Sequence, residues 1–139
     1  MKEEMLKVLI GAPLGLAAFL IGDFDIMILT LLALAVVDFG SGILNAIYRK
    51  NVDSRVMFWG GIKKVGILMV VAVANMIDKA LGLGGALRSM VIGYYMANEG
   101  ISILENWGGL GLPLPAGLRD VLAQLRDHGG EGEKENNRL

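Results

Sequence analysis

The chain has 139 residues, of which 54% are hydrophobic and only 19% are charged, and its formal net charge is −1. Soluble domains carry about 25% charged residues. Here the charges gather in clusters between long apolar runs, so we expect a small integral membrane protein. Without a basic excess, no nucleic-acid partner is expected. The chain has no cysteine and one histidine, His128, which excludes thiol catalysis, disulfides and Cys or His metal clusters.

The first apolar run, residues 8–22, carries no charge but is shorter than the ~20 residues that usually span a bilayer. A secretory signal peptide is the alternative, because lysines precede this run. Its end is a poor cleavage site, however, and another apolar run follows almost at once. We therefore expect an uncleaved helix over about residues 6–22, in which Gly11 and Gly15 offer a packing face.

Three more apolar segments predict helices over about residues 26–48, 62–83 and 89–107. The segment 26–48 is the clearest, because its length suits the bilayer and it holds one charge. The expected fold is an all-α integral membrane protein, with a bundle of three or four transmembrane helices within residues 1–112. The number of crossings depends on whether the first segment spans the membrane.

The chain changes character after the fourth segment. Pro113 and Pro115 end the helix, because proline cannot continue one. Apolar residues then recur at helical spacing and predict a short amphipathic helix over residues 113–127. Its apolar face would consist of Leu118, Val121, Leu122 and Leu125. The polar, Gly-rich residues 128–139 are expected to form a disordered tail.

Charges in the loops predict the orientation. The loop between the second and third segments is rich in Arg and Lys, which favours the cytoplasm. The loop between the first two segments holds Asp23 and Asp25 without a base, and a solvated loop outside is expected there rather than a metal pair. The amphipathic helix and the C-terminus are then cytoplasmic.

Two acids lie inside the apolar segments. Asp38 is 12 residues beyond Ile26 and Glu99 is 10 residues beyond Ser89, or about 18 and 15 Å along their helices. An ionisable group at the bilayer centre costs about 2.5–3.5 kcal/mol on insertion scales. The sequence places no basic residue at a matching depth. The two acids are therefore expected to be protonated, hydrogen-bonded to Ser, Asn or Tyr, or exposed to water.

Each acid is followed by a serine three residues later and an asparagine seven residues later, which places all three on one helical face. The polar stripes consist of Asp38, Ser41 and Asn45 on the second segment and Glu99, Ser102, Glu105 and Asn106 on the fourth. One interpretation is hydrogen bonding between helices. The other is the lining of an aqueous lumen, which so small a chain could enclose only as a homo-oligomer.

Small residues also recur every four positions, a spacing typical of close helix packing. They are Gly42 and Ala46 on the second segment and Ser89, Gly93 and Ala97 on the fourth. The pattern predicts tight helix contacts, within or between protomers.

No enzyme motif is found. The Gly-rich residues 82–85 follow no strand, so they indicate a turn rather than a phosphate-binding loop. We expect no catalytic residue, cofactor or metal.

The run from Tyr95 to Asn106, with the sequence YMANEGISILEN, resembles the hallmark of the toxin-secretion and phage-lysis holin family. A Gly-containing link, a proline pair and a short helix follow, as they do in that family. The runs at residues 38–42 and 60–66 are also similar, so the resemblance extends from about Ile28 to Arg126. The C-terminal tail departs from the family, because acids outnumber bases where many holins end in a Lys-rich stretch.

The resemblance implies a holin that associates in the bacterial cytoplasmic membrane. Its lesions or pores would release an endolysin, or a large secreted protein such as a toxin, without necessarily binding that cargo. Two alternatives share the same composition. One is a small proton-coupled membrane transporter, and the other is a structural membrane subunit whose acids only hold helices together.

Overall fold

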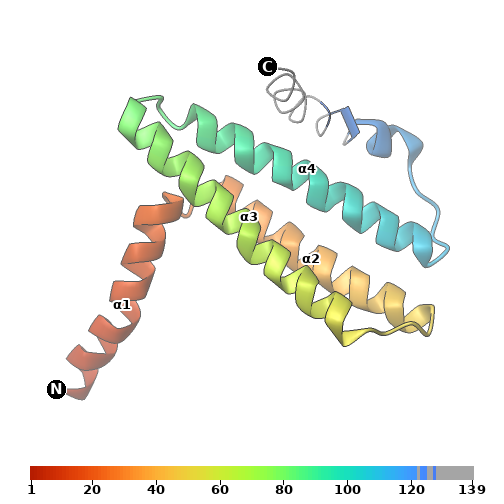
Figure 1. Cartoon of the computed structure of the whole chain (residues 1–139), viewed down its shortest axis with the longest axis horizontal. Coiled ribbons are helices and arrows are strands. Elements are labelled where there is room, and N and C mark those ends of the chain that lie inside the picture. Colours follow the sequence, from red (N-terminus) through yellow and green to blue (C-terminus); the bar gives the residue numbers. More distant parts are fainter. Residues whose placement is uncertain (122, 125–126, 128–139) are drawn as a thin grey trace.

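The computed structural model describes residues 1–121, 123, 124 and 127. Within that part the secondary structure is entirely helical, which confirms the expected all-α class (Figure 1). The four long helices are α1 (Lys2–Ile21), α2 (Ile26–Tyr48), α3 (Ser54–Leu81) and α4 (Ala86–Gly109).

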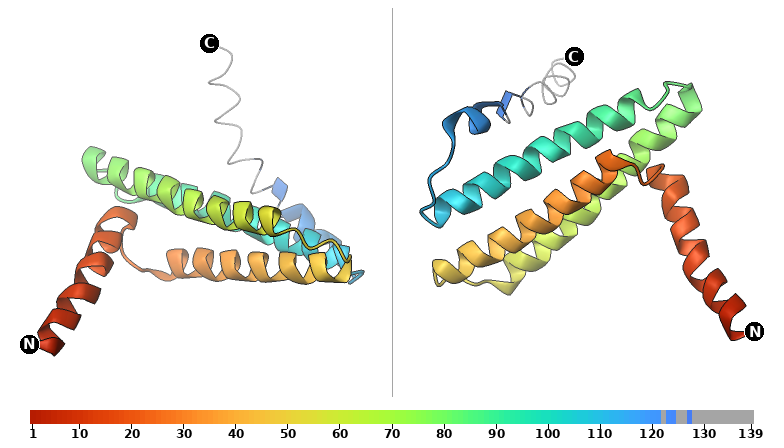
Figure 2. Two further views of the ribbon diagram at one scale, coloured as in Figure 1. Left: turned by 60° about the horizontal axis from the view of Figure 1, so that its bottom comes forward. Right: turned by 180° about the vertical axis from the view of Figure 1, so that it is seen from behind.

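Helices α2, α3 and α4 form a bundle, and α1 extends away from it. α4 packs along both α2 and α3, whereas α2 and α3 touch each other much less. α1 packs mainly against α3 and points away from the bundle, as both views in Figure 2 show. It contains no buried residue, and the chain turns between α1 and α2 at Gly22, whose φ is positive.

Polar side chains fix where the helices begin. The Asp25 carboxylate accepts a hydrogen bond from the Ile28 backbone N–H at 3.0 Å and caps α2. Asp53 caps α3 by accepting from the Arg55 backbone N–H at 2.8 Å. α3 therefore begins at Ser54, well before the expected start near residue 62, because a side-chain cap there outweighs the lower hydropathy of its first turns.

Three helices, α1, α2 and α3, are long and apolar enough to cross a membrane by length and composition. α4 is not among them, because it carries three charged side chains and is less apolar. It nevertheless lies beside α2 and α3 along their length (Figure 1). The sequence predicted that the fourth segment crosses the membrane and left open whether the first does. Length and hydropathy instead favour α1 over α4 as a membrane-spanning helix.

The chain beyond α4 turns back toward the side of that helix (Figure 1). Residues 116–121 are helical, as are residues 123, 124 and 127. Leu118 and Val121 of the expected apolar face are 47% and 54% exposed. The other two residues of that face, Leu122 and Leu125, and the expected tail of residues 128–139 lie outside the described residues.

Candidate functional site

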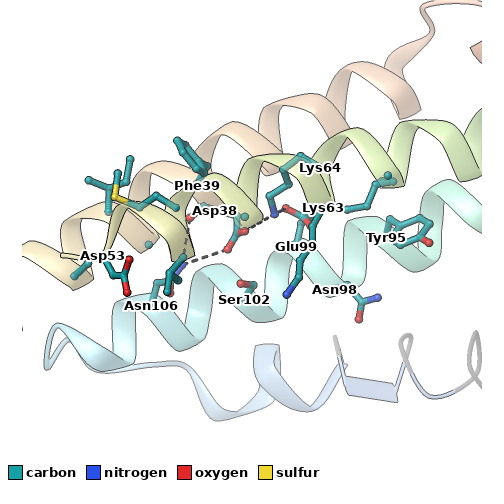
Figure 3. A pocket seen from close by; sticks show the side chains of 18 of the residues that line it. Asp38, Phe39, Asp53, Lys63, Lys64, Tyr95, Asn98, Glu99, Ser102 and Asn106 are labelled. Atoms are coloured by element: carbon teal, nitrogen blue, oxygen red, sulfur yellow. Dashed lines mark hydrogen bonds and ion pairs between the residues drawn. The ribbon is translucent and has the colours of Figure 1, made fainter. Parts of the chain in front are cut away.

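A lysine joins the two intramembrane acids. The Lys64 ammonium on α3 donates to the Asp38 carboxylate on α2 and to the Glu99 carboxylate on α4 (Figure 3). The two acidic side chains are only 11% and 6% exposed, and that of Lys64 is 22% exposed. We call these three residues the charged triad. It ties all three helices of the bundle together.

The expectation that no base lies at the depth of the acids is wrong. The prediction failed because the third helix begins earlier in the chain than expected. With a helix beginning near residue 62, Lys64 would lie at the membrane edge. With α3 beginning at Ser54, Lys64 lies ten residues inside the helix, or about 15 Å from its start.

Two further residues of the expected polar stripes, Ser41 and Asn106, meet Asp38 of the triad. The Asn106 side-chain amide donates to the Asp38 carboxylate and main-chain oxygen, both at 3.2 Å, and to Ser41 Oγ at 2.9 Å. The Ser41 hydroxyl donates in turn to the Asp38 carbonyl at 3.0 Å. Asp38 therefore has hydrogen-bond donors from two neighbouring helices, which is what a buried carboxylate requires.

A hollow of about 940 Å³ adjoins the triad. Glu99, Ser102 and Asn106 of α4 form its floor, and α2 and α3 form its walls. Exposed apolar residues border it, including Val56 and Val70 of α3. The hollow extends from the α2–α3 loop to the level of Val70, so it combines a polar floor with an apolar rim. Among the described residues, no group of acids and histidine is placed to hold a metal ion.

The remaining stripe residues lie apart from the triad. Asn45 accepts a hydrogen bond from Arg49 Nε at 3.1 Å and packs against Gly109. A Cβ at Gly109 would lie 2.5 Å from Asn45 Oδ1, so only glycine permits this approach of α2 and α4. Glu105 is exposed and does not line the hollow.

The expected small-residue contacts divide into two groups. Ala97 is buried, Ala46 lines the hollow, and a Cβ at Gly42 would lie 3.5 Å from Asn106 Nδ2, so these residues face the inside of the protomer. The other group lacks such neighbours within the described chain. Added Cβ atoms at Gly11, Gly15 and Gly93 would meet nothing within 4 Å, and Ser89 is exposed.

A second polar cluster lies at the opposite end of the bundle, and its centre, Arg88, is absent from the expected site. The Arg88 guanidinium, on a residue only 7% exposed, donates to Asp25 Oδ2 and the Ile21 carbonyl, both at 2.7 Å. It also donates to the Asp23 carbonyl at 2.9 Å. Arg88 is the sole arginine between residues 56 and 118, and this isolation is the signal that could have drawn attention to it.

Arg88 and its neighbours hold the end of α1. The Asn75 amide donates to the Leu20 carbonyl at 2.9 Å, and the Asp78 carboxylate accepts from the backbone N–H groups of Leu87 and Arg88 at 3.1 and 2.5 Å. Asp78 thereby caps α4, whose preceding residue is a glycine without a side chain. We call Asp25, Asn75, Asp78 and Arg88 the Arg88 cluster.

Asp25 is therefore not a freely solvated loop residue, although its side chain is 42% exposed. The hydrogen bond from Arg88 lowers the pKa of the Asp25 carboxyl below its usual value, and the bond from the Ile28 N–H acts in the same direction. Its carboxylate is thus the form that holds α2 and α4 together.

Several known proteins have sequences similar to this chain. The sequence pattern of the bacteriophage holin family matches residues 15–127. A Bacillus phage phi105 protein named a probable holin is 34% identical over 120 residues, or 86% of this chain and 88% of that protein. An uncharacterised protein of Listeria monocytogenes is 36% identical over 128 residues, or 92% and 89% of the two chains. An uncharacterised 14.9 kDa protein of Clostridium perfringens is 37% identical over 113 residues, or 81% and 86%. No solved structure matches this chain.

Proposed function

Because the chain belongs to the bacteriophage holin family, we propose that it associates with copies of itself in the bacterial cytoplasmic membrane and opens lesions there. An endolysin or another large protein, such as a toxin, would leave the cell through them without binding the lesion. This activity needs no catalytic residue, cofactor or metal, so we propose that the protein is not an enzyme.

The observation that carries the proposal is the charged triad beside the hollow. A lysine and two carboxylates lie inside a bundle whose other surfaces are largely apolar. The triad holds one more acid than base, so it is stabilised poorly by a dry interior and better by water. An assembly in which a wide lumen hydrates the triad fully is therefore favoured over the single protomer, in which water can reach the triad only through the hollow.

The hollow also suggests how a lumen is built. It lies between α2 and α3, which touch each other little. Its polar floor is formed by α4, and on the opposite side only the apolar rim residues separate this floor from the surroundings of the bundle. We propose that protomers in a ring turn this side toward a shared lumen. The outward residues Gly11, Gly15 and Gly93, which have no close neighbour within the described protomer, are the proposed contacts between copies.

The charges of the loops support one orientation. Arg49, Lys50 and Arg55 lie at the end of the bundle that also holds Asn106, and basic residues are retained in the cytoplasm. We therefore place this end, the Asn106 end, in the cytoplasm and the Arg88 cluster at the outer face. The C-terminal residues follow the Asn106 end and are cytoplasmic in this arrangement.

The first experiment is release from liposomes that carry size-graded cargo, from a small dye to a folded protein, at increasing protein density. Abrupt release of protein-sized cargo above a threshold density is expected for a lesion. Substrate-specific, saturable flux without release of protein would instead support a transporter. No release of any cargo by correctly inserted protein would support a structural subunit.

Two matched variants test the role of the triad. Glu99→Gln leaves one acid paired with Lys64, which makes the closed protomer more stable in lipid, so the threshold density for protein release should rise. Glu105→Gln changes the exposed acid of the same helix and should leave the threshold unchanged. Equal thresholds for the two variants and the unchanged protein would contradict a lumen role for Glu99.

A further inference from the structure

The bundle is layered along its axis, with polar groups at two levels and a dry layer between them. Four residues, Ile28, Leu31, Val71 and Ile92, are at most 1% exposed and pack together as the apolar core. We call them the apolar layer. They come from all three helices of the bundle, so the layer packs between α2, α3 and α4.

The register of this layer is the same on each helix. Leu31 precedes Asp38 by seven residues on α2, and Ile92 precedes Glu99 by seven on α4. On α3, which runs in the opposite direction, Val71 follows Lys64 by seven. Seven residues are about two helical turns, or about 10 Å, so the apolar layer and the triad face the same axis at two levels.

The hollow ends where the apolar layer begins. Ile67 and Tyr95 both line the hollow and pack against the apolar layer. From there the hollow passes the triad and reaches Asn51 and Asp53 in the α2–α3 loop, at the Asn106 end. On the other side of the layer lies the Arg88 cluster. Polar groups thus approach the apolar layer from both ends of the bundle.

We propose that each protomer contains its own narrow pathway for protons or small cations, which the apolar layer closes. Water would enter the hollow from the Asn106 end and reach the triad, while the four apolar side chains exclude water above it. Apolar constrictions in channels close pores by this dewetting. The pathway lies within one protomer, so it is distinct from the protein-sized lesion and needs no association.

The charges along the pathway select its ion. Three carboxylates and two lysines line the hollow, the acids being Asp38, Asp53 and Glu99. Beyond the apolar layer, Asp23, Asp25 and Asp78 outnumber Lys79 and Arg88. Both sides therefore carry one more acid than base, and acidic linings favour cations over anions.

The first test compares two identical substitutions in liposomes held below the density at which protein-sized cargo escapes. Val71 is fully buried in the apolar layer, whereas Val36 on α2 is 73% exposed. Val71→Ser wets the layer and should raise the flux of protons or K⁺ by about tenfold or more, with little change in chloride flux. Val36→Ser should leave both fluxes unchanged. Equal cation flux through the two variants would overturn the pathway.

A second test uses other variants, so it does not depend on the stability of the Val71 variant. Because the chain has no native cysteine, single introduced thiols can be labelled selectively. Ser102→Cys places a thiol in the hollow and should react with a membrane-impermeant reagent added at the Asn106 end only. Ile92→Cys places a thiol in the apolar layer and should resist the reagent from either side. Labelling of Ile92→Cys in the closed protomer, or no labelling of Ser102→Cys, would overturn the proposal.

The two proposals fail separately. If Val71→Ser conducts cations but no variant releases protein-sized cargo, the lesion is wrong and the pathway stands. If protein-sized cargo escapes above a threshold while Val71→Ser behaves as Val36→Ser does, the lesion stands and the pathway is wrong.

Discussion

The Arg88 cluster and the charged triad each hold a cation between helices, but they surround it differently. Arg88 donates to one carboxylate and two main-chain carbonyls, whereas Lys64 donates to two carboxylates. The guanidinium thus donates to the carbonyls at and just after the end of α1 and fixes the turn between α1 and α2, which we call the joint. Its planar set of donors suits that task. The lysine instead holds two acids that repel each other. The Arg88 cluster fixes the angle between α1 and the bundle, whereas the charged triad keeps one more acid than base inside the bundle.

The largest effect is expected from removing the lysine of the triad. Lys64→Met leaves two carboxylates together without their cation, which should lower the free energy of unfolding in detergent micelles by about 3 kcal/mol or more. Lys63→Met changes the adjacent lysine, which is exposed, and should cost far less. In a background with Asp38→Asn and Glu99→Gln, the cost of Lys64→Met should shrink. Equal costs for Lys64→Met and Lys63→Met would remove the distinction between the two clusters.

Arg88→Lys sharpens the comparison from the other side. A lysine keeps the charge but cannot reproduce three donors in a fixed plane, so a loss of about 2 kcal/mol in the free energy of unfolding is expected. Amide hydrogen exchange should accelerate at the end of α1 and at Gly22, but not around Asp38. Arg55→Lys, at an exposed arginine, is the control. Uniform acceleration along the bundle would mean that Arg88 supports the whole fold rather than the joint.

Gly22 tests the same joint through the backbone. Its φ is +91°, and an added Cβ would lie 2.8 Å from both Arg88 Nε and Asn75 Oδ1. Gly22→Ala should therefore cost about 1–3 kcal/mol in unfolding free energy. Gly11→Ala, inside α1 with open space around it, should instead stabilise by about 0.5–1 kcal/mol. Equal melting temperatures for these two variants would contradict a close-packed joint.

The smallest expected effect is a dependence of stability on pH. The pKa of Asp25 is lowered in the folded protein, so its contribution is complete above the ordinary aspartate pKa of about 3.9. It should be lost as the pH falls through the lowered value. Unfolding measured between neutral and strongly acidic pH should show this loss. Asp25→Asn should remove this part of the acid sensitivity, and Asp23→Asn, at the residue that meets Arg88 through its carbonyl, should retain it.

The sequence was sufficient for the helical class and for placing Asp38 and Asn106 on polar stripes, for which hydrogen bonding between helices was one of two interpretations. Both follow from apolar runs of membrane-spanning length and from residues spaced by three and seven on one helical face. The holin family was also evident, because the run around Glu99 is continuous in the chain.

The partner of the acids could not be found in the same way. Hydropathy placed Lys64 at a helix end, because the first turns of α3 mix polar, apolar and glycine residues and only the cap at Asp53 reveals that they are helical. Arg88 was missed for a related reason. Its partners include the carbonyls of Ile21 and Asp23, and main-chain atoms carry no signal in the sequence.

The bond between Arg88 and Asp25 also sets an order of events during synthesis. Its two partners are separated by 63 positions in the chain. At about 5–20 residues per second, a ribosome needs roughly 3–13 s to add the arginine after the aspartate. During that interval the chain lacks the group that fixes the turn between α1 and α2. The turn between α1 and α2 is therefore fixed late, when the first turn of α4 is made.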